Sequence, residues 1–115
     1  MYKEKFNSDN IDYDIIVGRN SKENWNLIDF ADGKDLWFHV DDKPSCHVFI
    51  KIPPNVDFIN KDVIIRAAQL CKEYSKYKND KKVKIIYTTI NNIKKAKDIG
   101  SVHIINHKKL ENITI

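Results

Sequence analysis

Residues 35–52 read DLWFHVDDKPSCHVFIKI, and this stretch decides the fold. Apolar side chains alternate with other side chains before and after the polar turn at 41–45, which is the periodicity of β-strands. If the two strands pair as a hairpin, apolar residues gather on one face, and aromatic, histidine and opposite-charge pairs gather on the other. The facing pairs are Leu36 with Ile50, Trp37 with Phe49, Phe38 with Val48, Val40 with Cys46, Asp35 with Lys51, and His39 with His47. A slip of one residue would destroy every match, so we predict this register.

Short elements separated by polar breaks lie on both sides of this hairpin. Hairpins mixed with helices favour an α+β two-layer domain, with a mixed, mostly antiparallel sheet and two helices, over a doubly wound parallel sheet. The predicted order is β-α-β-β-α-β-β-β. Beyond the hairpin, the elements are a strand at Tyr13–Val17, a helix from its N-cap Ser21 to about Phe30, a helix from about Lys61 to Tyr74, a strand at Val83–Ile90, a strand near Val102–Ile105 and a short strand near Ile113. Residues 1–10 are polar and are expected to form a flexible N-terminus before a single domain at 11–115.

The composition limits the class of protein. With 115 residues, 42% of them hydrophobic, the chain is long enough for one domain with a buried core. It has no run of ~18 apolar residues, so no membrane-spanning segment is expected. The two cysteines, Cys46 and Cys71, form no framework of disulfides, which favours reduced thiols and a cytoplasmic location.

Charge is distributed unevenly along the chain. The formal net charge is +4, but residues 1–60 carry 7 Lys+Arg against 11 Asp+Glu, and residues 61–115 carry 13 against 5. The two halves therefore hold −4 and +8. A basic half indicates an anionic partner, although an AT-rich coding genome produces the same excess of lysine.

The residues with reactive or metal-binding side chains do not form a catalytic or metal-binding pattern. His39, Cys46 and His47 are three potential zinc ligands without a fourth at a standard spacing. Cys46 and His47 are neighbours on a strand and point to opposite faces, which separates a potential nucleophile from its base. Paired carboxylates, a Walker loop and a GxSxG motif are absent from the sequence. We therefore expect no enzyme, no cofactor and no metal site.

A series of different short motifs follows in order along nearly the whole chain. They are Ile15–Asn20, Asn24, Leu27, Asp35–His39, Pro44, His47, Val48, Ala67, Ala68, Tyr74–Lys76, Tyr87, Thr88, Lys94, Lys95, Gly100 and Val102. This ordered set resembles the NFACT-R family, a domain of the ribosome-associated nuclear-export-mediator and fibronectin-binding-like proteins. The resemblance implies an RNA-binding module, which in full-length members helps a larger factor to recognise a large ribosomal subunit carrying an obstructed nascent chain and its tRNA. The chain looks more like the stand-alone members, some of which have been linked to DNA sensing.

The pair Arg19 and Asn20 is one candidate for contact with nucleic acid, because it follows a strand and precedes a helix. Backbone amides at a helix N-terminus and a nearby guanidinium bind phosphate together. Alternatively, Arg19 pairs with a local carboxylate and Asn20 stabilises the turn.

A second candidate is the aromatic face of the predicted hairpin. Trp37 and Phe49, with His39 and His47 at the rim, could stack unpaired bases. The alternative is that a helix covers this face, so that the aromatics belong to the core while the histidines lie at the surface.

A third candidate is the dense basic loop that contains Lys94, Lys95 and Lys97. A second group, with Lys81, Lys82 and Lys84, flanks the same strand pair, although either group could be no more than solvated surface. The basic patch indicates an anionic partner, and the resemblance to the NFACT-R family implies that this partner is structured ribosomal or transfer RNA, with association to the large ribosomal subunit in ribosome quality control. The alternatives are a module that docks on a ribosomal protein or quality-control factor, and a DNA-binding domain.

Overall fold

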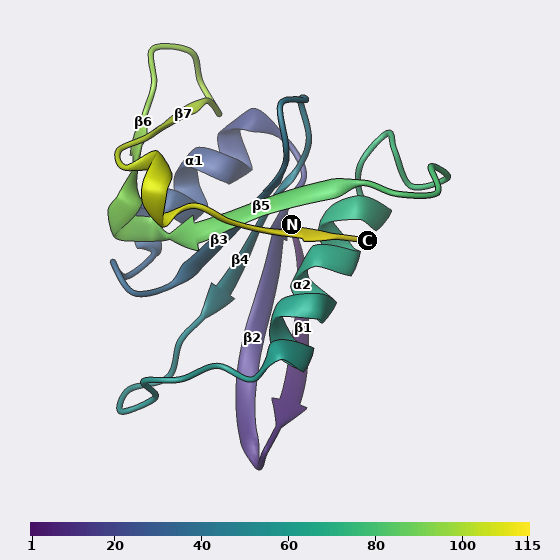
Figure 1. The fold of residues 1–115 in the computed structure, drawn as a ribbon. Coiled ribbons are helices and arrows are strands. Elements are labelled where there is room, and N and C mark those ends of the chain that lie inside the picture. Colours follow the sequence, from purple (N-terminus) through teal and green to yellow (C-terminus); the bar gives the residue numbers. More distant parts are fainter.

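The predicted hairpin lies at the centre of a six-stranded sheet in the computed structural model, which describes residues 1–115 (Figure 1). The elements are β1 (Tyr2–Ser8), β2 (Ile11–Gly18), α1 (Ser21–Phe30), β3 (Leu36–Val40), β4 (His47–Lys51), α2 (Lys61–Glu73), β5 (Lys84–Thr89), the 3₁₀ turn η1 (Ile90–Asn92), β6 (Ile93–Lys95), β7 (Val102–Ile104), the 3₁₀ turn η2 (His107–Lys109) and β8 (Glu111–Thr114). The main sheet has the spatial order β1-β2-β4-β3-β5-β8, and β6 pairs with β7 separately. The α+β class is confirmed, with every strand pair antiparallel.

The hairpin of β3 and β4 has the predicted register. Its paired residues are Leu36 with Ile50, Trp37 with Phe49, and Phe38 with Val48. Just outside this ladder, Lys51 Nζ lies 2.9 Å from Asp35 Oδ2. The register therefore assigns the side chains of these two strands to the two faces of the sheet as expected.

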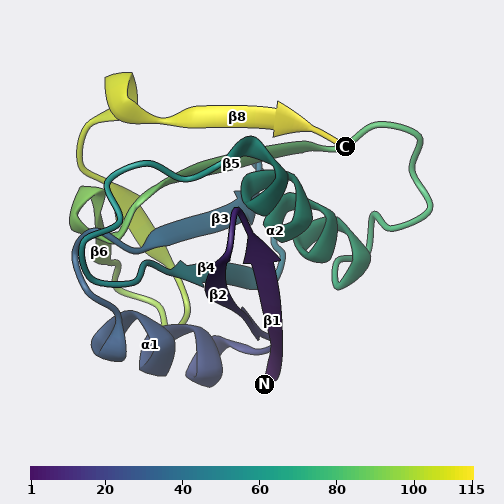
Figure 2. The ribbon, with the colours of Figure 1, turned by 90° about the horizontal axis from the view of Figure 1, so that it is seen from below.

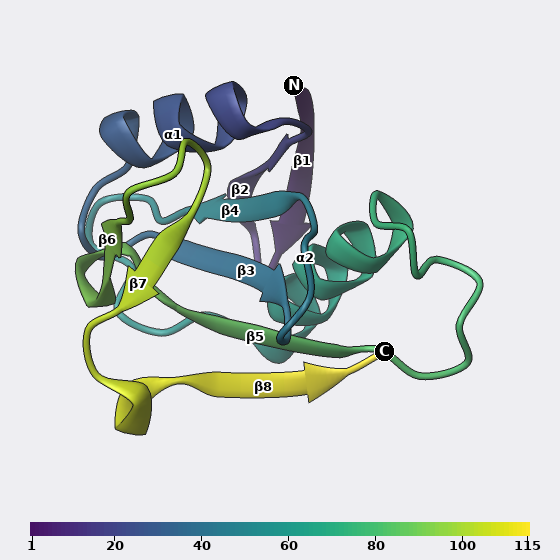
Figure 3. The ribbon, with the colours of Figure 1, turned by 90° about the horizontal axis from the view of Figure 1, so that it is seen from above.

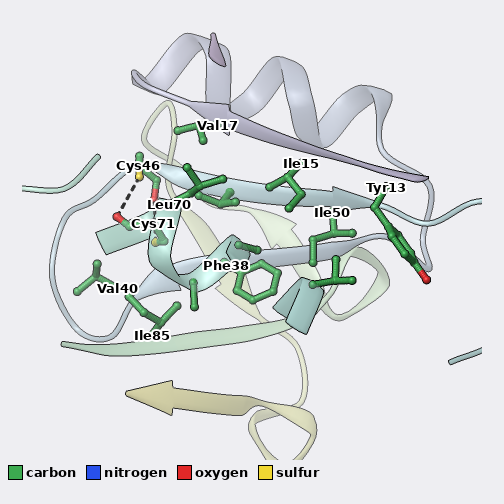
Figure 4. Close-up of a cluster of buried hydrophobic side chains, with 14 of the residues drawn as sticks. Tyr13, Ile15, Val17, Phe38, Val40, Cys46, Ile50, Leu70, Cys71 and Ile85 are labelled. Atoms are coloured by element: carbon green, nitrogen blue, oxygen red, sulfur yellow. Dashed lines mark hydrogen bonds between the residues drawn. The ribbon is translucent and has the colours of Figure 1, made fainter. Parts of the chain in front are cut away.

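The helix α2 lies across one face of the sheet and forms the main core with it (Figures 2 and 4). Ala67 and Ala68 are completely buried, and their small side chains let the helix approach the strands closely. The core cluster consists of Tyr13, Ile15, Val17, Phe38, Val40, Cys46, Val48, Ile50, Ile52, Val63, Ala67, Ala68, Leu70, Cys71, Val83 and Ile85. Neither α1 nor α2 has the length and apolar character needed to cross a membrane.

The other face of the sheet is partly covered by α1 and by the β6–β7 hairpin (Figure 3). The segment 91–100, predicted as a loop, contains β6, which pairs with β7 and lies over the sheet. The second buried cluster consists of Leu27, Trp37, Phe49, Ile90 and Ile93. The sheet thus has apolar contacts on both faces, and the smaller of the two clusters lies beside the candidate site.

The N-terminal residues form a strand, so the prediction of a flexible segment at 1–10 is wrong. β1 pairs with β2 along its whole length, and exposed Lys3 and Lys5 alternate with half-buried side chains. Asp9 and Asn10 form the connecting turn with φ values of 53° and 63°. Both residue types tolerate this left-handed conformation, which a two-residue hairpin turn requires. The polar composition concealed a period-two pattern followed by a suitable turn.

Contacts with α2 hold β1 in place. Arg66 donates hydrogen bonds to both carboxylate oxygens of Glu4, at 2.6 and 2.8 Å. Ser8 Oγ donates to Asp62 Oδ1 at 2.7 Å. A paired Arg–carboxylate fork restricts both side chains, so the first strand is joined to the helix as well as to β2.

Candidate nucleic-acid interface

Arg19 and Asn20 lie at the N-terminus of α1, where the chain supplies its own hydrogen-bond partners. Asn20 Oδ1 accepts a hydrogen bond from Glu23 N at 2.9 Å, and Glu23 Oε1 accepts one from Arg19 N at 3.1 Å. Arg19 Nε also lies 3.9 Å from Glu23 Oε1. Asn20 rather than the predicted Ser21 is therefore the N-cap, because Ser21 is already the first helical residue. The geometry corresponds to the alternative of a local ion pair and a stabilised turn, and contact of Arg19 with RNA stays a prediction.

Trp37 and Phe49 are buried, with exposed fractions of 2% and 3%. Leu27 of α1 and Ile93 of β6 belong to the same buried cluster. A base cannot stack on rings that the protein itself covers, so the stacking role predicted for these two aromatics is wrong. The β6–β7 hairpin, which is distant in sequence, folds back over the sheet and covers the two rings together with α1. Trp37 and Phe49 therefore belong to the core, which was the alternative interpretation.

His39 and His47 lie side by side on this face, with ring centroids 5.1 Å apart. His47 is only 3% exposed, so its predicted place at the surface is wrong. Trp37 Nε1 donates a hydrogen bond to His47 Nδ1 at 3.1 Å, and His39 Nδ1 lies 2.6 Å from the Val40 carbonyl oxygen. Burial lowers the pKa of His47 to about 3, with a further contribution from His39, and burial also lowers the pKa of His39. Both rings are therefore neutral near pH 7.

A cleft of about 620 Å³ lies above the two histidines. The floor comes from β3, β4 and β5, one wall from the β3–β4 loop, and the other from the β6–β7 hairpin and the start of α1. Asp42 and Lys43 in the loop wall carry opposite charges. The residues that line the cleft are Ser21, Asn24, Trp37, His39, Asp42, Lys43, Pro44, Ser45, His47, Ile86, Ile99, Gly100, Ser101, Val102 and Ile104.

The tip of the β6–β7 hairpin is attached to α1. Trp25 Nε1 donates a hydrogen bond to the Ser101 carbonyl oxygen at 3.1 Å. Gly100 has a φ of 90°, and a Cβ atom added there would lie 2.7 Å from Ser21 Cβ. A glycine is therefore required at this position both by the backbone conformation and by the close approach to α1.

Replacing Gly100 with alanine is expected to displace the hairpin tip from α1, because the added methyl group meets Ser21 and because alanine disfavours this φ. We expect a loss of about 1–3 kcal/mol in the free energy of unfolding and faster amide exchange at 96–101. Gly33→Ala is the matched control, since its added Cβ would come no closer than 3.3 Å, to Asn91 Cβ. Equal effects of the two substitutions on amide exchange at the tip would contradict the prediction.

The three predicted lysines of the hairpin have different environments. Lys95 Nζ lies 2.6 Å from Asp29 Oδ1 and 4.9 Å from the centroid of the Trp25 ring, so this lysine joins the hairpin to α1. Lys94 and Lys97 are exposed, and Lys94 is paired across the ladder with His103. Two of the three predicted cations are thus free to meet an anionic ligand.

The second group of lysines lies at the opposite end of β5. Lys81 and Lys82 precede this strand, whereas η1 and β6 follow it. The six residues of β5 separate the two groups by roughly 20 Å. Lys84 Nζ, in addition, lies 3.5 Å from Asp41 Oδ2. The two basic groups therefore do not combine into one surface.

Cys46 lies on the other face of the sheet from the two histidines. It belongs to the core beneath α2, where its Sγ donates to the Cys71 carbonyl oxygen at 3.5 Å (Figure 4). The side chains of His39, Cys46 and His47 consequently do not converge. This arrangement follows from the alternation of side chains along β4.

The sequence reasoning missed several residues near the site. Lys43 and Ser45 line the cleft, and their position in the turn of the predicted hairpin was a usable signal for this. Lys108 and Lys109 lie on η2, which follows β7 and is joined to η1 by two hydrogen bonds between Asn92 and Asn106, at 2.9 and 3.0 Å. The antiparallel pairing of β6 with β7 and the contact between Asn92 and Asn106 bring η2 to the end of the molecule that carries η1 and β6 (Figure 1).

Comparisons with known proteins identify the family of the chain. A family model described as NFACT protein RNA binding domain matches residues 1–105. Coiled-coil domain-containing protein 25 of Danio rerio is 36% identical over 103 residues, which cover 84% of this chain and 48% of that protein. Rqc2 homolog RqcH of Bacillus subtilis is 33% identical over 82 residues, which cover 70% of this chain and 14% of that protein. The chain thus spans about half the length of the coiled-coil domain-containing relatives that it matches.

A solved structure has the same fold. It is the C-terminal part of the fibronectin/fibrinogen-binding protein from Streptococcus suis, which superposes with a TM-score of 0.81 at 23% identity and covers 100% of this chain and 45% of that one. This likeness concerns the fold alone. The family model supplies the further step, because its match runs from β1 through β7 and includes both walls of the cleft. The chain therefore belongs to the NFACT protein RNA-binding domain family.

Proposed function

We propose that this domain binds structured ribosomal or transfer RNA through the surface formed by the β6–β7 hairpin and η2, in the setting of ribosome quality control. Membership of an RNA-binding domain family and the similarity to Rqc2 homolog RqcH support the RNA partner and the setting. The observation that carries the choice of surface is the exposure of Lys94 and Lys97 on the hairpin that supplies one wall of the cleft. Lys108 and Lys109 are exposed on η2, which lies next to η1 at the base of the same hairpin.

The charge of this surface explains how RNA would be bound without a sequence-specific contact. Lysines bind phosphates as point charges and release the counterions condensed on the nucleic acid. Lys94 and Lys97 have no carboxylate within ion-pair distance, whereas Lys95 has Asp29. We therefore assign the phosphate contacts to Lys94 and Lys97 and a positioning role to Lys95, which fixes the hairpin on α1.

The double substitution Lys94→Glu and Lys97→Glu is expected to weaken RNA binding roughly tenfold at low salt, because two phosphate contacts become repulsive. The slope of log affinity against log salt should become shallower by about 1.4–1.8, according to the counterions released per contact. Titration of a fluorescent ribosomal RNA fragment over a salt series measures both quantities. Thermal unfolding should be almost unchanged because both side chains are exposed.

The control is the double substitution Lys81→Glu and Lys82→Glu, which changes the net charge equally at the other end of β5. An equal loss of affinity in both double variants would show that only net charge matters and that the assigned surface is wrong. Absence of RNA binding by the wild-type protein at low salt would contradict the RNA proposal itself.

A second candidate function is docking on a protein. Phe30, at the C-terminus of α1, is 82% exposed, and large exposed aromatic side chains are frequent at protein interfaces. Pull-down with large ribosomal subunits, before and after nuclease treatment, separates the two functions. RNA binding predicts loss of the interaction after nuclease treatment, whereas protein docking predicts that Phe30→Ser removes an interaction that nuclease leaves intact.

A further inference from the structure

The two neighbouring histidines at the floor of the cleft are held in opposite tautomers. Trp37 Nε1 carries a hydrogen and can only donate, so His47 Nδ1 accepts and the proton of this ring is on Nε2. The Val40 carbonyl oxygen can only accept, so His39 Nδ1 donates and His39 Nε2 bears a lone pair. The protein thus presents one ring donor and one ring acceptor next to each other.

Neither Nε2 atom has a hydrogen-bond partner within the protein. The hydrogen bonds of the His39 and His47 rings use Nδ1 alone. No fully buried side-chain nitrogen or oxygen lacks a partner, so the two Nε2 atoms must reach the solvent of the cleft. His47 is 97% buried as a residue, so its Nε2–H is among the few parts of this side chain that remain accessible to a ligand in the cleft.

The cleft has the volume and the mixed polar and apolar lining of a ligand site. Its volume of about 620 Å³ lies within the usual range of ligand sites. Ile86 and Ile104 supply apolar surface, while the single acidic Asp42 and the single basic Lys43 nearly balance each other. Burial lowers the pKa of both histidines and keeps them uncharged near pH 7, so the floor does not attract phosphate.

We propose that this cleft receives one unpaired nucleobase of the bound nucleic acid, and that His47 Nε2 and His39 Nε2 contact its Watson–Crick edge as donor and acceptor. The inference rests on the RNA-binding function proposed above. It adds that the cleft above His39 and His47 binds a base, whereas the proposed function concerned phosphates. Each of the four bases presents an adjacent donor and acceptor on this edge, and the edge is free only when the base is unpaired. Lys94 and Lys97, on the hairpin that supplies one wall of the cleft, would hold the flanking phosphates.

The test compares a short oligoadenylate with its abasic counterpart and with its duplex. The wild-type protein should bind the single strand at least ~5-fold more tightly than the abasic strand, and the duplex should lose the base-dependent part. His39→Phe keeps an aromatic ring but removes the acceptor, so it should weaken binding of oligoadenylate ~3- to 10-fold and leave abasic binding unchanged. Lys94→Glu with Lys97→Glu should weaken binding of both strands alike. An oligodeoxyadenylate arm shows whether the base comes from RNA or DNA.

Nuclear magnetic resonance gives a measurement that does not depend on a folded variant. Long-range correlations of the ring nitrogens should show opposite tautomers for His39 and His47, and adenosine monophosphate should shift both Nε2 signals. Equal affinity for the base-containing and abasic strands would overturn the base contact while leaving RNA binding intact. If the protein binds no RNA at all, the proposed function fails, and shifts with adenosine monophosphate then support the cleft, whereas their absence overturns it.

Discussion

Replacing Asp35 with alanine is expected to lower the free energy of unfolding by about 3–4 kcal/mol, the largest effect of any single polar substitution that we predict. Asp35 is only 1% exposed and precedes the central hairpin. Its carboxylate accepts three hydrogen bonds at 2.9 Å, from Lys51 Nζ, from the backbone amide of Ile52 and from the backbone amide of Asp32. Alanine would leave the buried amide of Ile52 without a partner and would remove the buried partner of the Lys51 ammonium.

Asp32→Ala is the matched control for this substitution. Asp32 Oδ2 also lies 3.0 Å from Lys51 Nζ, but its side chain is 68% exposed. An exposed ion pair contributes about 0–1 kcal/mol, so the control should change stability only within that range. Urea unfolding of the two variants at neutral pH measures the difference. Similar losses in both would contradict a special role for the buried carboxylate.

A second large effect is expected from acidification, because His47 is kept neutral in the folded domain. Burial lowers the pKa of His47 from 6.5 to about 3, so between these values the unfolded chain binds a proton at this residue and the folded chain does not. Well above pH 6.5 the His47 ring is neutral in both states and does not affect the free energy of unfolding. As the pH falls below 6.5, the unfolded state binds the proton first and the folded domain becomes less stable. At 1.36 kcal/mol per pH unit, His47 alone should lower the free energy of unfolding by about 2–3 kcal/mol between pH 6.5 and 4.5, and the lowered pKa of His39 acts in the same direction.

The pH range from 6.5 to 4.5 distinguishes the effect of protonating His47 from the effect of protonating the carboxylates, which occurs mainly at lower pH. The hydrogen bond from Arg66 lowers the pKa of Glu4 below its ordinary value of 4.5, so the contribution of this residue is lost at still lower pH. The variant His47→Gln retains an acceptor for Trp37 Nε1 and should show a flatter stability profile between pH 6.5 and 4.5. His107→Gln, at an exposed position on η2, is the control for the loss of one histidine. An unchanged slope in His47→Gln would show that the acid sensitivity arises elsewhere.

The sequence was sufficient to predict the central hairpin because its information is local. Cross-strand pairing of Trp37 with Phe49 and of Asp35 with Lys51 allows one register, and the structure has that register. The boundaries of α1 and α2 were also close to those predicted, since their apolar spacing is regular. β1 was missed because its side chains alternate between charged and half-buried ones in a polar segment, so that composition and periodicity disagree.

The candidate site was only partly predictable because it depends on long-range contacts. The burial of Trp37 and His47 is produced by α1 and by the β6–β7 hairpin, whose tip meets α1 through Trp25 and Ser101. Residues 76 positions apart in the chain make this contact, and no local pattern indicates it. The separation of the two lysine groups by β5 likewise appears only in the folded chain. Charge could be counted from the sequence, but its arrangement in space could not.

The position of β8 beside β5 has a consequence for the order in which the domain assembles. β8 is the last strand of the sheet in sequence, and Ile85 pairs with Ile113 and Val83 with Ile115 across this edge. During synthesis, β5 emerges before β8. Until β8 pairs with it, the edge of β5 on that side exposes unpaired backbone groups to any other extended chain. Completion of the sheet therefore waits for the C-terminal strand. Before this strand pairs with it, the edge of β5 is a place where an incompletely synthesised domain is prone to mispairing and aggregation.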